Sequence, residues 1–343
     1  KSSINSLAGQ VAISISSSAI GAAVGINRIS NTIKAYIDNS NVDTTDLGNV
    51  IVSADEQAWI KSLSVGASMA GSSFALGGSV SINLITNTIE AKITGTKAIN
   101  AHGSILVSAF DDTDSWALAG NFSLGSSNAV GISNVTLITN NDTKAYIGEN
   151  ADVTAKGSGN GVSAYTGSVP KSKTSIMSKL LYEVLDLFKT PGAKASKKTE
   201  TVKGLAVVAA SFEDYTSFAV GGTAAGSNGV AGSATISVLN EDARAAIDKG
   251  AKINIGGNPA ANNGESVVVR AIDQTNLFGL AGAIAAGGST GVGAGIDVAV
   301  ITKDTIAIID AGATVTANRD VKVEAISSED ISSMAASIAI GGS

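Results

Sequence analysis

The sequence predicts an all-β fold, a parallel β-solenoid built from tandem repeats of about 54–62 residues and interrupted by one inserted amphipathic helix. Three observations support this fold class. Strand-like segments recur at a near-constant spacing, apolar and small polar residues alternate with a period of two, and small and β-branched residues dominate the composition. Right-handed coiling is expected, because parallel crossovers within one sheet are almost always right-handed.

The clearest repeat is an Ala-x-Ile frame that follows an Asn- or Asp-rich turn. Its copies are Ala35/Ile37, Ala91/Ile93, Ala145/Ile147, Ala245/Ile247 and Ala307/Ile309. Successive copies lie 56, 54, 100 and 62 residues apart. The long interval contains 46 residues between two strand ends, Ala164 and Ala210, and 54 residues remain without them. One period therefore underlies the chain, and we interpret residues 1–343 as a single elongated solenoid.

Two further strands recur within each period. A short strand appears as Ile99/Ala101, Val153/Ala155, Ile253/Ile255 and Val315/Ala317. A strand that ends in Ala appears as Val50-Val52-Ala54, Ile105-Val107-Ala109, Val162-Ala164, Ala206-Val208-Ala210, Val267-Val269-Ala271 and Val321-Val323-Ala325. Stacking the copies would pair their backbones ~4.8 Å apart and bury the apolar positions as continuous ladders.

The rest of the period is a polar step followed by two long strands. After the step comes an Ala/Gly/Ser-rich strand, such as residues 60–70, then a Gly-rich turn and a second strand, such as residues 79–85. A period of roughly 55 residues is too long for one narrow coil. It predicts either two to three coils, or one wide coil that carries a long hairpin, and the sequence leaves both open.

Composition and charge exclude several classes of protein. The hydrophobic content of 44% argues against disorder, and the net charge of −6 gives no basic face for nucleic acid. The chain has no Cys, so it forms no disulfide or thiolate metal site. The uncharged stretch at residues 274–296 is too rich in Gly for a transmembrane helix, so we expect a chain that does not span a membrane.

A Lys-rich insertion at residues 168–203 breaks the repeat pattern. Its eight Lys against three acidic residues give it a net charge of +5. Apolar residues at helical spacing predict an amphipathic helix near residues 174–189. The helix could fold its apolar stripe back on the solenoid, or dock on a partner or an anionic membrane. The predicted partner contacts are Lys173, Lys179, Leu180, Val184, Leu187 and Phe188.

No motif in the sequence predicts catalysis, a cofactor or a metal site. His102 is the only histidine and is interpreted as an exposed turn residue. The stretch Gly291–Gly295 lacks the Lys-Ser/Thr of a phosphate loop and is interpreted as tight packing. Acidic pairs such as Asp111-Asp112 recur once per repeat, which is typical of solvated corners. Weak calcium binding and catalysis are the alternatives for these pairs.

Three segments resemble the repeats of a known family. Residues 202–214, 230–235 and 141–148 are similar to repeats of leukotoxin-family filamentous adhesins, which are related to filamentous haemagglutinin. The resemblance implies export across the outer membrane as an autotransporter-type or two-partner-secreted β-helical passenger. It also implies a role in adhesion, aggregation or host-cell damage. No catalytic residues carry over, because the repeats have none.

We therefore expect a structural and adhesive repeat segment of a very large exported surface protein, a stalk or filament at the bacterial cell surface or outside the cell. The expected partners are receptors on host or neighbouring cells, and copies could associate end to end or laterally. Both ends are interpreted as cuts inside a longer array, because residues 338–343 stop in mid-pattern.

Two other classes of protein are alternatives. A polysaccharide-active β-helix enzyme would need carboxylates that converge on one groove in a non-repeating manner. An outer-membrane β-barrel would need aromatic girdles, which 7 Phe, 5 Tyr and 2 Trp cannot supply. The long strands are also expected to have small residues on both faces, with no lipid-facing band.

Overall fold

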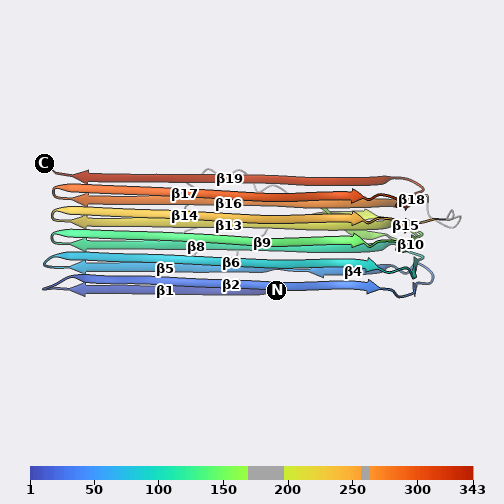
Figure 1. Cartoon of the computed structure of the whole chain (residues 1–343), viewed down its shortest axis with the longest axis horizontal. Helices are drawn as coiled ribbons and strands as arrows, with labels where there is room; N and C mark the ends of the chain where they lie inside the picture. Colours follow the sequence, from blue (N-terminus) through green and yellow to red (C-terminus); the bar gives the residue numbers. More distant parts are fainter. Residues whose placement is uncertain (169–196, 256–262, 343) are drawn as a thin grey trace.

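The computed structural model describes residues 1–168, 197–255 and 263–342, and strands dominate this part of the chain (Figure 1). Period-two alternation and the abundance of β-branched residues favour this outcome. Among these residues there is no helix, and hence none long and apolar enough to cross a membrane. The predicted helix at 174–189 lies outside the described residues, as do all six of its predicted partner contacts.

Each repeat forms one wide coil that contributes a strand to each of three parallel sheets. Long sheet 1 contains β1 (Ser2–Ser14), β4 (Val50–Asp55), β5 (Ala58–Ala70), β8 (Ile105–Gly125), β13 (Gly204–Ala225), β16 (Ser266–Gly287) and β19 (Val321–Gly341). Long sheet 2 contains β2 (Ala19–Asp38), β6 (Phe74–Thr94), β9 (Asn128–Ile147), β14 (Asn228–Ile247) and β17 (Thr290–Ile309). The short sheet contains β3 (Val42–Asp43), β7 (Ala98–Ala101), β10 (Asp152–Ala155), β15 (Lys252–Ile253) and β18 (Thr314–Val315).

The strand registers reproduce the repeat spacings of the sequence. Ladder neighbours in long sheet 2 are 56 residues apart at Asn27 and Asn83, and 54 apart at Ser79 and Ser133. The later intervals of 100 and 62 residues also hold in the ladders. The structure thus decides between the two coil arrangements that the sequence left open. One period is one wide coil whose two long strands fold back on each other.

The segment just before the insertion differs from the prediction. Val162 and Ala164 were predicted to form a coil strand, but they lie on β11 (Val162–Ser168), which pairs antiparallel with β12 (Lys197–Val202). The coil strand of this repeat is β13, and its residues Leu205, Val207 and Ala209 pair with the β8 ladder. The predicted set Ala206-Val208-Ala210 is therefore wrong by one residue.

The physical reason for this error is that both faces of β13 are buried here. Ala206, Val208 and Ala210 point outward and pack in one cluster with Val162 and Ala164 of the hairpin. The inward set Leu205, Val207 and Ala209 belongs to the interior core. A strand buried on both faces is apolar at every position, so alternation cannot fix its phase.

Along the long strands the solenoid has two parts that differ in cross-section. The three-sided part lies at the end where β10, β15 and β18 are labelled in Figure 1. There the short sheet closes the coil between the two long sheets, and Val, Ile and Ala fill the interior. The flat part runs from there to the turns at residues 71–73, 126–127, 226–227 and 288–289. In it only the two long sheets face each other, across small residues such as Ser62 and Ser81, whose hydroxyls are hydrogen-bonded.

Candidate functional site

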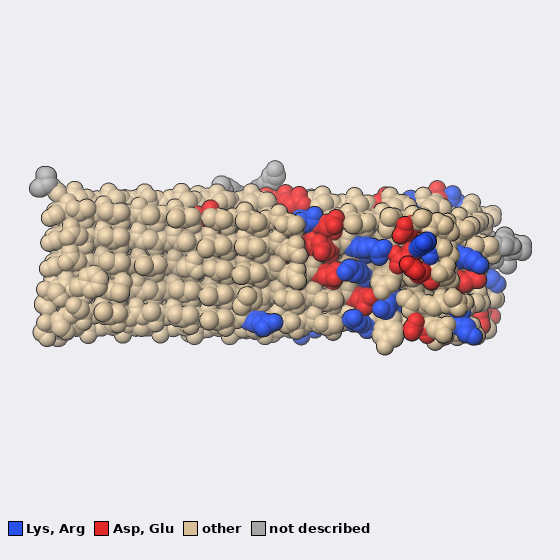
Figure 2. Space-filling view, in the orientation of Figure 1, with Lys and Arg blue, Asp and Glu red and all other residues tan. Residues whose placement is uncertain are grey.

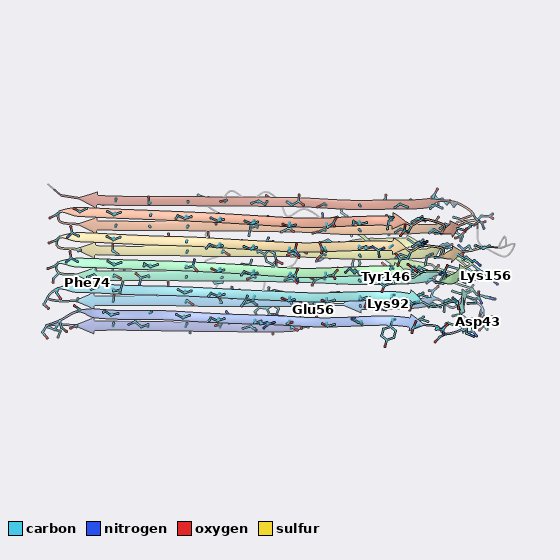
Figure 3. The ribbon with its side chains drawn as sticks, viewed as in Figure 1. Asp43, Glu56, Phe74, Lys92, Tyr146 and Lys156 are labelled. Carbon is cyan, nitrogen blue, oxygen red and sulfur yellow. The ribbon has the colours of Figure 1, made fainter. Side chains whose placement is uncertain are left out.

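A buried polar layer separates the flat part from the three-sided part. Ladder pairing places its side chains in three inward rows. Long sheet 1 supplies one row with Asp111, Ser211, Asp273 and Ser327, and a second row with Thr113, Glu213, Thr275 and Glu329. Long sheet 2 supplies Asn31, Asn87, Asn141, Glu241 and Lys303. Glu56, labelled in Figure 3, adds a carboxylate beside Asp111.

The acidic residues of this layer are not the solvated corners that the sequence predicted. Asp111, Asp273 and Glu241 are fully buried, and Glu213 is 2% exposed. All four lie within long strands and not at turns. The sequence contained this information, because Val107, Ala109 and Asp111 lie at intervals of two residues on one strand and so share a face. A continuous strand therefore places Asp111 on the core face.

Short polar side chains bind the buried carboxylates. The Asn87 amide donates to Oδ1 of Asp111 at 3.3 Å and to Oγ1 of Thr113 at 2.9 Å. The hydroxyls of Thr139 and Tyr215 donate to Oε1 of Glu241. Oδ2 of Asp111 and Oε2 of Glu241 have no hydrogen-bond partner among the described residues.

One lysine enters the layer at its C-terminal side. Nζ of Lys303 lies 2.6 Å from Oδ1 of Asp273 and 3.3 Å from Oε1 of Glu329. It also donates to Oγ1 of Thr275 at 3.0 Å, and that hydroxyl donates to Oε2 of Glu213 at 2.8 Å. Lys303 therefore compensates part of the negative charge that this layer would otherwise bury.

Burial governs the protonation of these carboxyls. Burial, assisted by the negative charges of Glu56 and Asp112, raises the pKa of Asp111 to about 7 against the hydrogen bonds from Thr113 and Asn87. It raises the pKa of Asp273 to about 6, against the opposing charge of Lys303. Burial also raises the pKa values of Glu213 and Glu241 well above their usual range. Burial therefore favours the neutral form of these acids.

The geometry of the layer favours a structural role. A polymeric substrate could not reach carboxyl oxygens that are buried between two sheets. Within residues 1–168, 197–255 and 263–342, no group of three or more His, Asp or Glu is arranged to hold a metal ion. Side-chain hydrogen bonds of the layer join the two long sheets at the place where they begin to diverge.

The other candidates of the sequence lie apart from this layer. His102 lies at a turn beside the short sheet, but it is half-buried, and its Nε2 is 3.1 Å from Nζ of Lys156. Gly291 lies against backbone, since a Cβ there would meet the carbonyl oxygen of Ile340 at 2.2 Å. That contact confirms the packing interpretation of the Gly-rich stretch.

The base of the insertion is anchored on the outer face of long sheet 1. Nζ of Lys197 lies 3.9 Å from the ring centroid of Phe212 and 2.8 Å from Oδ1 of Asp112. The rings of Tyr165 and Phe110 stack at 4.6 Å. These contacts give the insertion a fixed stem where it leaves the solenoid.

A second anchor of the stem is Arg270 on β16. Its guanidinium pairs with Glu200 of the hairpin at 2.6 Å and with Glu324 of the next coil. It also donates to the backbone carbonyl of Tyr165 at 3.0 Å. Because the Arg270 side chain is only 4% exposed, these are charge-assisted contacts with little competing water.

The outer faces of the flat part are apolar, contrary to the expectation of small residues on both faces. On long sheet 1 the exposed positions include Val65, Met69, Phe122, Val220, Ile284 and Ile338. On long sheet 2 they include Ile132, Ile138, Val230, Ile236, Val238, Val292, Val298 and Val300. We call the second set apolar face 2. Toward the turns, small residues occupy the inward positions, because the two sheets approach each other closely there.

Most charged residues lie at the other end of the long strands (Figure 2). In Figure 2 the left part of the face in view is nearly free of charged residues, which gather on the right. In the three-sided part, Glu90 binds Lys92 at 3.1 Å, Lys34 at 3.2 Å and the Tyr146 hydroxyl at 2.7 Å (Figure 3). Burial opposes ionisation of Glu90, but these donors outweigh it and lower its pKa to about 2.

Comparisons with protein-family models, with characterised proteins and with solved structures gave no match to this chain. The resemblance to filamentous adhesins therefore stays a prediction from the residues of the sequence.

Proposed function

We propose that the chain is a structural and adhesive repeat segment of a very large exported surface protein, a stalk or filament that presents contacts for cell adhesion or aggregation. One observation carries the proposal. The coils stack in register through every long strand, so their backbones are hydrogen-bonded from coil to coil. Each added repeat lengthens such a stack by one strand spacing without changing its cross-section.

The anchored hairpin supports the adhesive part of the proposal. Lys197 and Arg270 fix its two strands to the solenoid, and residues 169–196 connect these strands in the sequence. The predicted contacts Lys173, Lys179, Leu180, Val184, Leu187 and Phe188 belong to this segment. The positive charges of Lys173 and Lys179 suit an anionic receptor on a host or neighbouring cell. A location outside the cell or at the bacterial cell surface rests on the resemblance to filamentous adhesins.

A polysaccharide-active enzyme is the less favoured alternative. Glycosidic chemistry needs two carboxyl groups within reach of the polymer. The clustered carboxyls of this chain, Asp111, Glu213, Glu241 and Asp273, are buried between the long sheets.

An adhesion assay with the purified chain tests the proposal. Beads coated with the chain are expected to bind epithelial or bacterial cells, and the double variant Lys173→Glu/Lys179→Glu is expected to lower the number of bound beads several-fold. The matched control Lys252→Glu/Lys322→Glu reverses two exposed charges on the solenoid itself and is expected to bind as the unchanged chain does. Absence of binding by the unchanged chain, or an equal loss in both variants, would overturn the proposal.

A further inference from the structure

The flat part of the solenoid has an inverted distribution of polarity. Inward positions carry buried polar side chains, among them Ser79, Ser81 and Asn83 on β6, each fully buried. Outward positions on the same sheet carry Ile and Val, with Ile132 53% and Val292 49% exposed. A surface that exposes rows of β-branched residues to water is typical of an interface that is covered in the assembled state.

The shape of apolar face 2 suits a flat, closely packed contact. The outward row of Ile20, Leu76, Val130, Val230 and Val292 is bulky, and so is the row of Ile26, Ile82, Thr136, Ile236 and Val298. Two rows lie between them. One consists mainly of small residues, Ala22, Gly78, Ile132, Gly232 and Ala294, and the other consists of Val24, Val80, Asn134, Ala234 and Ile296. A Cβ built on Gly232 would meet nothing within 4 Å, so the row of small residues has open space above it. Bulky rows of an opposing sheet could lie along such a row.

The size of the face is close to that of a stable interface. Nine residues along each strand at ~3.3 Å, over five strands ~4.8 Å apart, cover about 700 Å². Specific protein interfaces bury about 800 Å² on each partner. A face-to-face pair of identical surfaces would therefore bury close to the standard interface area.

The positions of the outward charged residues limit how far the contact can extend along the strands. Within the flat part of long sheet 2, Arg28 on the end strand β2 is the one outward charged residue of the described chain. Outward charges begin beyond it, with the column Asp142, Asp242 and Asp304. Burial raises the pKa of Asp242, and the neighbouring charges of Asp142 and Asp304 raise it further. Two copies that overlap only through their flat parts, with strands running in opposite directions, leave both charged ends in water.

We propose that a second copy of this chain docks face to face on apolar face 2. The area of the face argues for a second copy, and a lipid surface is the alternative occupant that the vesicle experiment below tests. Long sheet 1 is the less favoured side for the contact, because the insertion hairpin packs on its outer face. The association does not depend on receptor binding and would stand even if the chain bound no cells.

Sedimentation of the purified chain over a concentration series tests the proposal. The chain is expected to form a dimer, and Val230→Lys/Ile236→Lys is expected to weaken the association at least 100-fold, because it buries uncompensated charge at the centre of the contact. The matched control Val220→Lys/Ile284→Lys changes two equally exposed residues on the outer face of long sheet 1 and is expected to remain dimeric. Circular dichroism melting of each variant separates loss of association from loss of fold.

Three results would overturn the proposal. The first is a monomer at every concentration. The second is a dimer that the control disrupts and the test variant does not. The third is a monomer that floats with phosphatidylcholine vesicles and is released by Val230→Lys/Ile236→Lys, which would assign the face to lipid.

Discussion

The flat part and the three-sided part of the solenoid are made by the same strands, yet they place their apolar residues on opposite faces. On β9, Ala145 and Ile147 point into the three-sided core, and Lys144 points outward. Nearer the turn, Ser133 points inward and Ile132 outward. The spacing between the long sheets therefore determines which side chains fill the interior. Where the short sheet holds the long sheets apart, Ile and Val fill the space. Next to the polar layer on the flat side the interior still holds large residues such as Leu137 and Tyr215, and only nearer the turns do Ser, Ala and Gly line it.

The polar layer reconciles the two parts. Asp111, Glu213 and Glu241 lie where the Val, Ile and Ala core of the three-sided part ends, at the level of the interruption between β4 and β5. Hydrogen bonds from Asn87 to Asp111 and from Tyr215 to Glu241 join the two long sheets across this space.

The largest effect is expected from a substitution that separates the two sheets of the flat part. A Cβ on inward Gly66 would meet the carbonyl oxygen of Gly78 at 2.5 Å, and backbone cannot move aside. We expect Gly66→Val to prevent folding or to lower the melting temperature by more than ~10 °C. The matched variant Gly120→Val lies on the outer face of the next coil, where the nearest atom is 3.5 Å away, and should melt at or above the unchanged chain. Equal melting of the two variants would contradict the close approach of the sheets.

A second prediction compares two isoleucines on β9. Ile147 is fully buried in the three-sided core, whereas Ile132 is 53% exposed on the flat part. We expect Ile147→Ala to lower the free energy of unfolding by about 3 kcal/mol, and Ile132→Ala by less than about 1 kcal/mol in the monomer. Urea unfolding measures both values. If Ile132→Ala lowered the free energy of unfolding more than Ile147→Ala, the principal core would not lie in the three-sided part.

A third prediction concerns the polar layer and pH. Because burial raises the pKa of Asp111 from 3.8 to about 7, the folded chain binds more protons than the unfolded chain between these values. The contribution of Asp111 to stability therefore falls as pH rises from about 4 to about 7, and it stays low above that. Asp111→Asn is expected to raise the free energy of unfolding at pH 8 by about 2 kcal/mol and to change it little at pH 4.

Urea midpoints at the two pH values measure this effect, with Asp320→Asn as the control for an exposed aspartate. A variant that is less stable than the unchanged chain at pH 8 would mean that the Asp111 carboxylate is a favourable part of the layer. The inference that burial disfavours the charged form of Asp111 would then be wrong.

The repeat period and the positions of the long strands could be predicted from the sequence, because stacked coils keep their register and the registers of 56, 54, 100 and 62 residues follow directly. Which residues of β13 point inward could not be predicted, because Leu205 is buried in the core and its neighbour Ala206 is buried by the hairpin. The number of coils per period could not be predicted either, because alternation describes a strand but not what lies across from it.

The candidate surfaces were harder to predict than the fold. If the predicted strand had been extended past the polar step, the alternation of side chains along β8 would have placed Asp111 in the interior. The apolar faces of the flat part were missed, because Gly, Ala and Ser on inward positions masked the Val and Ile that alternate with them. Reading the two faces of each strand separately would have shown the inversion.

Cysteine accessibility tests the inversion most directly, because the chain has no Cys of its own. Single variants are Phe122→Cys and Ser123→Cys in the flat part, and Lys144→Cys and Ala145→Cys in the three-sided part. We predict fast reaction with a water-soluble thiol reagent at Phe122→Cys and Lys144→Cys, whose native side chains are exposed or half-exposed. We predict protection at Ser123→Cys and Ala145→Cys, whose native side chains are buried. Fast reaction at Ser123→Cys with protection at Phe122→Cys would contradict the inverted flat part.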